Sequence, residues 1–86
     1  MIDILIVHVL DALVVSFHTD QPHIFRSALA DFKARVPPGC RRYHRSAQAW
    51  VLRHGAADYL GAFCTEMRTA YGARVEHINA LRPNGQ

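Results

Sequence analysis

Acidic side chains are missing from the middle of this 86-residue sequence, although the whole chain contains seven. No Asp or Glu occurs from Phe32 to Ala57, a stretch we call the acid-free segment. Its basic side chains are Lys33, Arg35, Arg41, Arg42, Arg45 and Arg53, and the whole chain has a formal net charge of +3. A net charge of this size alone indicates an anionic partner only weakly, so the clustering is the more informative feature.

Cysteine is also scarce, because Cys40 and Cys64 are the only two in the chain. Two cysteines are too few for a disulfide framework, and each lies in an apolar segment, where buried free thiols are common. The apolar N-terminal stretch lacks a basic start and a small-residue cleavage site, and Asp3 and Asp11 make it unsuited to a membrane span. We therefore expect a soluble, reduced, cytoplasmic protein that makes no membrane contact.

Signatures of catalysis and of metal binding are absent as well. The five glycines are scattered and form no phosphate-binding loop. The cysteines and histidines considered as metal ligands, or as nucleophile and base, are Cys40, His44, His54, Cys64 and His77. They show neither the C-x-x-C nor the H-x-x-x-H spacing of zinc sites, and no nucleophile elbow surrounds Cys64. We predict a protein that is not an enzyme and has no metal site and no cofactor.

The first half of the chain predicts two strands and a helix. Ile2–Val9 and Leu13–Phe17 are rich in β-branched and aliphatic residues, and a turn at Asp11-Ala12 would join them as a hairpin. Apolar residues recur at helical spacing from Pro22 to Arg35, with a proline in the first turn. Pro37-Pro38-Gly39 then ends the helix.

The second half repeats this order. Cys40–Arg45 and Gln48–Arg53 predict a second hairpin that turns near Ser46-Ala47. A helix follows over roughly Ala56–Tyr71, with an amphipathic apolar stripe and with Gly72 just past its end.

Arg74–Ile78 is a candidate for a short last strand, and Leu81–Gln86 reads as a flexible tail. We therefore predict one α+β domain over residues 1–80, ordered ββαββα with a short C-terminal strand, in which two helices pack on an antiparallel sheet. A chain of this length supports one such domain with a modest core.

The hairpin in the acid-free segment is the candidate binding surface. Phosphates need cations, unstacked bases need flat π-surfaces, and arginine serves both. The predicted nucleic-acid-binding residues are Lys33, Arg35, Arg41, Arg42, Tyr43, His44, Arg45 and Arg53. Alternation places Arg41 and Tyr43 on one face and Arg42 and His44 on the other, and a change of register by one residue would exchange the faces. A solvated polar face is the competing interpretation, and Trp50 is expected in the core.

Several short motifs resemble the HARP domain, an accessory module that gives annealing helicases of the Swi/Snf type their preference for forked DNA. They run from Val14 to Phe63 and comprise Val14-Val15-Ser16-Phe17, a helix through Phe25 to Phe32-Lys33, Tyr43, Trp50-x-Leu52 and Tyr59-Leu60. His44 stands where that family usually has an acidic residue, and the 86 residues contain no helicase motor. The resemblance implies DNA contact through the hairpin, by a module that does not remodel DNA alone.

The sequence thus predicts a small non-enzymatic module that contacts single-stranded or branched DNA through its arginine-rich hairpin. The alternative is a protein-interaction module, such as an accessory protein or a phage-type inhibitor, that docks on an acidic partner. It would also explain the apolar strand Ile2–Val9, which could pair with another chain if it lay at a sheet edge. A homodimer is compatible with both functions.

Overall fold

A computed structural model describes residues 2–80 of the chain, as five strands and two helices. The elements are β1 (Asp3–Val9), β2 (Ala12–His18), α1 (Pro22–Arg35), β3 (Arg41–His44), β4 (Ala49–Arg53), α2 (Ala57–Tyr71) and β5 (Arg74–Asn79). Single 3-10 turns, η1 (Pro38–Cys40) and η2 (His54–Ala56), precede β3 and α2. The predicted tail Leu81–Gln86 lies outside the described residues.

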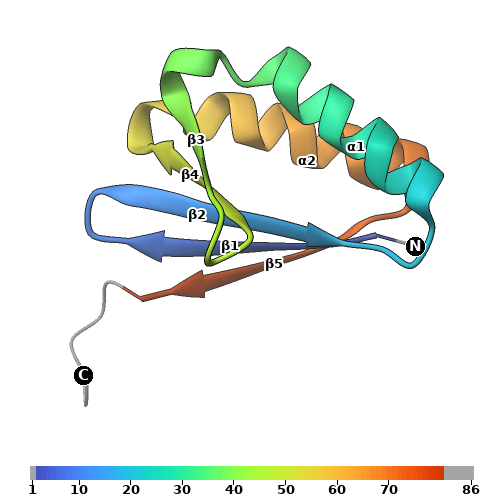
Figure 1. The fold of residues 1–86 in the computed structure, drawn as a ribbon, viewed down its shortest axis with the longest axis horizontal. Coiled ribbons are helices and arrows are strands. Elements are labelled where there is room, and N and C mark those ends of the chain that lie inside the picture. The colour runs from blue at the N-terminus through green and yellow to red at the C-terminus, as the bar shows by residue number, and fades with distance from the viewer. Residues whose placement is uncertain (1, 81–86) are drawn as a thin grey trace.

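The strands form one sheet in the order β3-β4-β2-β1-β5, and both helices lie on the same side of it (Figure 1). The predicted α+β class and order of elements are confirmed. The sheet is mixed rather than antiparallel, however, because β5 pairs in parallel with β1. Helix α2 carries the chain back over the sheet from β4 to β5, which is the kind of connection that strands running in the same direction require.

The N-terminal strand β1 does not lie at a sheet edge. It pairs with β2 on one side and with β5 on the other, so its backbone is already bonded along both sides. Pairing of another chain with this strand, which the sequence left open, is therefore excluded by the sheet order. The edge strands are β3 and β5.

Both helices begin and end near the positions that the sequence predicts. α1 spans the predicted Pro22–Arg35, with the proline in its first turn, and the backbone becomes extended at Val36, ahead of Pro37. α2 ends at Gly72, whose φ of 63° is left-handed and whose N–H donates to the carbonyl of Arg68. Neither helix within residues 2–80 is long and apolar enough to cross a membrane.

The two hairpins turn as their sequences suggest, with one shift. Val9 pairs with Ala12, so the first turn is Leu10-Asp11 rather than the predicted Asp11-Ala12. In the second hairpin the N–H of Gln48 donates to the carbonyl of Arg45, which centres the turn on the predicted Ser46-Ala47.

The core lies between the helices and the side of the sheet that faces them. The buried side chains of the sheet include Ile4, Ile6, Leu13, Val15, Phe17 and Leu52, and those of the helices include Ala28, Phe32, Leu60, Phe63 and Met67. Phe32 is central, since its ring lies 5.7 Å from Phe17 and 5.2 Å from both Phe63 and Trp50, centroid to centroid. These aromatic contacts join α1, α2 and the two hairpins in one core.

Candidate nucleic-acid interface

Strand β3 distributes the predicted cations over the two faces of the sheet. Arg41 lies opposite Leu52, a core residue, so Arg41 and Tyr43 are on the side of the helices. Arg42 and His44 are on the opposite side, which no described element covers. The structure thereby decides the question of the faces that the sequence left open. Because β3 is an edge strand, both rows remain along one border of the domain.

Arg41 is held by contacts within the protein. Its Nε donates a hydrogen bond of 3.0 Å to the carbonyl oxygen of Val36, just after α1. Its guanidinium carbon lies 5.6 Å from the centroid of the Trp50 ring, and the Nζ of Lys33 lies 5.9 Å from the same ring. Cation–π contacts of this kind contribute about 0.5–1 kcal/mol each at exposed sites. Arg41 therefore attaches the hairpin to the end of α1, and Lys33 adds to that attachment.

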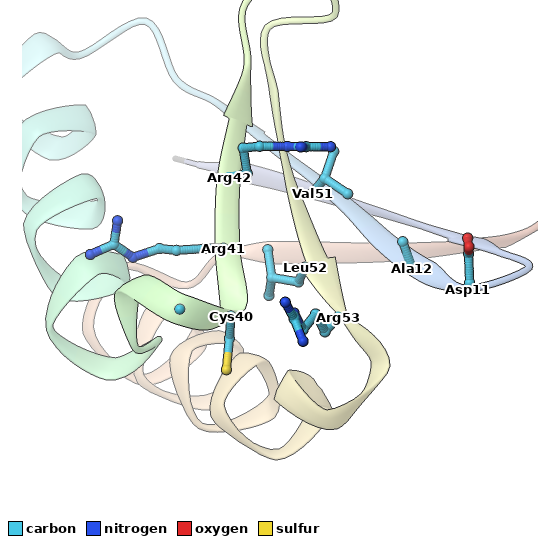
Figure 2. A pocket seen from close by; sticks show the side chains of 9 residues that line it. Asp11, Ala12, Cys40, Arg41, Arg42, Val51, Leu52 and Arg53 are labelled. Atoms are coloured by element: carbon cyan, nitrogen blue, oxygen red, sulfur yellow. The ribbon is translucent and has the colours of Figure 1, made fainter.

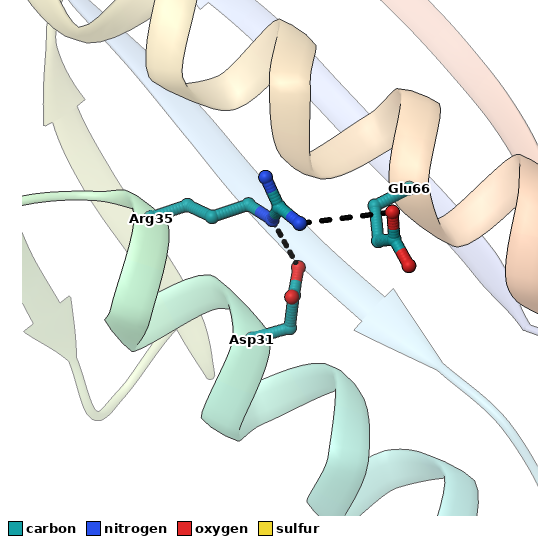
Figure 3. A network of polar contacts seen from close by, with 3 residues as sticks. All are labelled: Asp31, Arg35 and Glu66. Atoms are coloured by element: carbon teal, nitrogen blue, oxygen red, sulfur yellow. Dashed lines mark hydrogen bonds and ion pairs between the residues drawn. The ribbon is translucent and has the colours of Figure 1, made fainter.

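Among the predicted nucleic-acid-binding residues, Arg35 forms ion pairs with two carboxylates. Its Nε donates to Asp31 Oδ2 at 2.9 Å, and one of its terminal nitrogens lies 3.6 Å from Glu66 Oε1 (Figure 3). Both carboxylates come from outside the acid-free segment, one from α1 and one from α2. Pairing with them makes Arg35 less available to a phosphate than a free arginine would be.

Arg42, Arg45 and Arg53 are exposed, and within residues 2–80 no carboxylate forms an ion pair with any of them. Arg42 and Arg53 line a hollow of about 480 Å³ that also includes Val51 and Cys40 (Figure 2). The figure shows Arg42 extending across the hairpin toward Val51, whereas Arg41 points away on the other side of β3. These three arginines are the free cations of the hairpin.

His44 and Arg45 lie at the tip of the hairpin. The Nδ1 of His44 lies 3.1 Å from the hydroxyl oxygen of Ser46, which orients the exposed imidazole ring. Arg45 opens the turn that Gln48 closes, and Gln48 has a left-handed φ of 51°. Both side chains are exposed.

An exposed aromatic surface lies beside these cations. Tyr43 is 48% exposed and rests against Trp50 with ring centroids 5.1 Å apart. β2 pairs with β4 only as far as Val15 and Trp50, so the hairpin separates from β2 beyond that point. The resulting hollow of about 250 Å³ is lined by Phe17, Phe25, Tyr43 and Trp50, among others. Trp50 packs on the core at Phe32, as expected, and also forms part of this hollow.

A histidine pair that the sequence did not reveal joins β1 and β5. His8 Nε2 and His77 Nδ1 lie 3.0 Å apart, with the rings stacked at a centroid distance of 5.3 Å. Both histidines line a hollow together with Cys64. Burial raises the pKa of the Cys64 thiol, and the positive charge of Arg68 partly offsets this rise. The raised pKa keeps the thiol protonated and therefore a weak nucleophile. Among residues 2–80 no group of three or more His, Cys, Asp or Glu side chains is arranged to hold a metal ion.

Comparisons of the chain with protein-family models, with curated proteins and with solved structures find no match. The resemblance to the HARP domain and the DNA contact that it implies therefore stay predictions. The geometry of the hairpin itself is therefore the basis for a proposed function.

Proposed function

We propose that this chain is a small non-enzymatic module that binds single-stranded or branched nucleic acid, DNA in the first place, along its edge strand β3. The observation that carries the proposal is the set of free cations Arg42, Arg45 and Arg53 on the β3–β4 hairpin, whose other face carries the exposed ring of Tyr43. The sequence resemblance to the HARP domain points to the same hairpin.

The free arginines of the hairpin complement the negative charge of a phosphate backbone. A phosphate backbone that runs along the hairpin would pass Arg42 on the edge strand β3, Arg45 in the turn and Arg53 at the end of β4. Each phosphate neutralised on a single strand releases counterions and contributes about −0.7 to the slope of log affinity against log salt concentration. Three contacts, from Arg42, Arg45 and Arg53, therefore predict a slope of about −2.

Tyr43 would add a stacking platform. A base stacked on an aromatic side chain contributes about 1–3 kcal/mol, and the bases of a single strand are free to stack. The hollow between Tyr43, Trp50 and Phe25 is also lined by Gln48, which closes the turn that Arg45 opens, so a base could enter it while its phosphates meet Arg45. Bases in an intact duplex are already stacked, which is why we expect a preference for single-stranded or forked DNA.

Contacts within the protein support a smaller set of nucleic-acid-binding residues than the eight that the sequence suggests. Arg35 is paired with two carboxylates, while Arg41 and Lys33 lie against the Trp50 ring. We assign these three mainly to the stability of the domain, and the contact to nucleic acid mainly to the free arginines with Tyr43 and His44.

The test is fluorescence anisotropy with labelled single-stranded, forked and duplex oligonucleotides at several salt concentrations. The hairpin variant replaces Arg42, Arg45 and Arg53 with Gln. A matched control replaces Arg26, Arg68 and Arg74 with Gln as well. These are exposed arginines of α1, α2 and β5, so both variants lose the same charge. Circular dichroism verifies that both fold.

We expect the hairpin variant to bind single strands at least about ten-fold more weakly, with the salt slope reduced by about 2, while the control retains most of its affinity. An equal loss in both variants would mean that only net charge matters. No binding by the unaltered protein would refute the proposal.

A protein-interaction role remains the second candidate, and a different surface favours it. The side of the sheet away from the helices carries several partly exposed aliphatic residues, among them Leu5, Val7 and Val14. Apolar surface gathered on one side of a domain marks an interaction site more often than a nucleic-acid groove.

A further inference from the structure

The side of the sheet opposite the helices is apolar at its centre. Its aliphatic side chains are Leu5, Val7, Val9, Val14, Val51 and Ile78, of which Ile78 is 43% exposed and the others are half-buried. Their neighbours on the helix side of β1, Ile4 and Ile6, are 1% and 2% exposed. None of the elements within residues 2–80 covers this aliphatic face (Figure 1). An uncovered face of this kind is typical of an interaction surface.

The charges on this side of the sheet lie mainly at its two borders, and Arg53 adds a further cation at the end of β4. Arg42 and His44 project from β3 at one edge of the sheet. Glu76 projects from β5 at the other edge, next to Arg74 and Asp3, which lie 3.8 Å apart as an ion pair. One border is therefore basic, and the other holds the unpaired carboxylate of Glu76.

A second copy of the chain fits this arrangement. A twofold axis along β2, parallel to the strands and lying between two stacked sheets, would place β3 of each copy over β5 of the other. The register then sets Val14 against Val14 of the second copy, and Val51 against Val7 of the second copy. The same register sets Arg42 over Ile78 of the second copy, one position along the face from Glu76, and brings His44 level with Glu76.

The alternative twofold axis is disfavoured by charge. An axis across the strands, with the sheets again face to face, would stack each β3 on the β3 of the second copy. Arg42 and His44 would then approach the same basic residues, and like charges opposed across an interface are unfavourable. The distribution of charge therefore selects the orientation along β2, in which the sheets stack as in an aligned sandwich.

We propose that two copies of this chain associate face to face through this aliphatic face, with Val14 on the twofold axis. Four gaps of about 4.8 Å between strands, and about 3.3 Å per residue along the strands, make the face roughly 20 Å in each direction. It would bury on the order of 1,000 Å² in total, near the lower limit for a specific interface. The dimer should therefore be weak, with a dissociation constant in the micromolar range or above.

The dimer does not depend on the proposed nucleic-acid role. Arg45 lies in the turn and Tyr43 on the helix side of the hairpin, outside the stacked faces, whereas Arg53 lies on the stacked side at the end of β4. Arg42 lies at the border, where it could serve a phosphate or Glu76 of the second copy. Substitutions at the centre of the aliphatic face leave every cation of the hairpin in place, so the two proposals can fail separately.

Sedimentation equilibrium from about 1 μM to about 1 mM tests the proposal, because that range covers weak dimers. We expect a reversible monomer–dimer equilibrium for the unaltered chain. Val14→Lys would oppose two lysines on the axis and weaken the dimer at least about ten-fold, a loss of at least about 1.4 kcal/mol. Ala34→Lys, at an exposed position of α1, adds the same charge away from the face and should have no effect.

A charge exchange provides a second test that does not depend on correct folding of Val14→Lys. Glu76→Arg alone should weaken the dimer, and adding Arg42→Glu to it should restore association, because the borders are then complementary again with their signs reversed. A chain that is monomeric throughout the range overturns the proposal. A dimer that survives Val14→Lys, or that the charge exchange fails to restore, overturns it too.

Discussion

Arg41 and Arg42 are neighbours in sequence, yet the structure predicts that they have opposite importance for stability. Arg41→Met keeps an unbranched apolar side chain but removes the hydrogen bond to Val36 and the cation over Trp50. Arg42→Met removes an exposed charge with no ion-pair partner within residues 2–80. Because both variants replace Arg with Met, the comparison separates an arginine that stabilises the fold from an exposed one without an ion-pair partner.

The expected magnitude follows from the two contacts of Arg41. A cation–π contact contributes about 0.5–1 kcal/mol, and a hydrogen bond from a charged donor about 1.5–3 kcal/mol. Because Arg41 is only partly buried, we expect a loss near the lower end of the sum, about 2 kcal/mol. A domain of this size has an unfolding free energy of roughly 4–13 kcal/mol, so the loss is substantial. The melting temperature should fall by about 8–16 °C.

Urea and thermal unfolding followed by circular dichroism measure the effect without relying on the fluorescence of Trp50, which the substitution itself would change. Arg42→Met should stay within about 0.5 kcal/mol of the unaltered protein, as most surface substitutions do. If Arg41→Met were as stable as Arg42→Met, the contacts of Arg41 would not hold the hairpin to α1. Arg41 would then rejoin the candidate binding residues.

Substitutions at three further positions test the fold. Phe32→Ala removes a fully buried ring that contacts both helices and both hairpins, and should cost about 3–5 kcal/mol in urea unfolding; a loss below 1 kcal/mol would contradict the assigned core. Gly72→Ala has room for its Cβ, so the left-handed backbone alone should cost about 1–2 kcal/mol, and Gly72→Asn should cost less. Above pH 9.0 the thiol of Cys64 ionises in the unfolded chain, but it stays protonated in the folded protein because burial raises its pKa. The unfolding free energy of the unaltered protein should therefore fall as the pH rises, and that of Cys64→Ala should fall less. Parallel pH profiles would contradict the burial of this thiol.

The helices were predictable because their ends are marked locally. Pro22 and Pro37 bracket α1, and Gly72 ends α2, so these boundaries depend on backbone chemistry that acts over a few residues. The hairpins follow from their strand composition and short connections in the same way. At Leu10-Asp11 no glycine fixes the turn, and the prediction was wrong by one residue.

The order of the sheet could not be predicted, because it depends on contacts between residues far apart in the sequence. The parallel pairing of β5 with β1 joins His8 to His77 and removes β1 from the sheet edge, and no local pattern announces it. The contact of Arg35 with Glu66 was hidden for the same reason, whereas its closer pairing with Asp31, four residues earlier on α1, follows a local spacing that the sequence does show. The composition of the acid-free segment located the basic hairpin, but only the pairing of β3 with β4 shows that Arg41 faces the helices and Arg42 the opposite side.

The most direct test of the central claim is the anisotropy titration of a labelled single-stranded oligonucleotide at several salt concentrations. We expect binding in which log affinity falls with log salt concentration at a slope of about −2. Replacing Arg42, Arg45 and Arg53 with Gln should abolish that slope, and replacing Arg26, Arg68 and Arg74 should leave it nearly unchanged. The same slope in both triple variants would contradict the assignment of nucleic-acid binding to the border formed by β3.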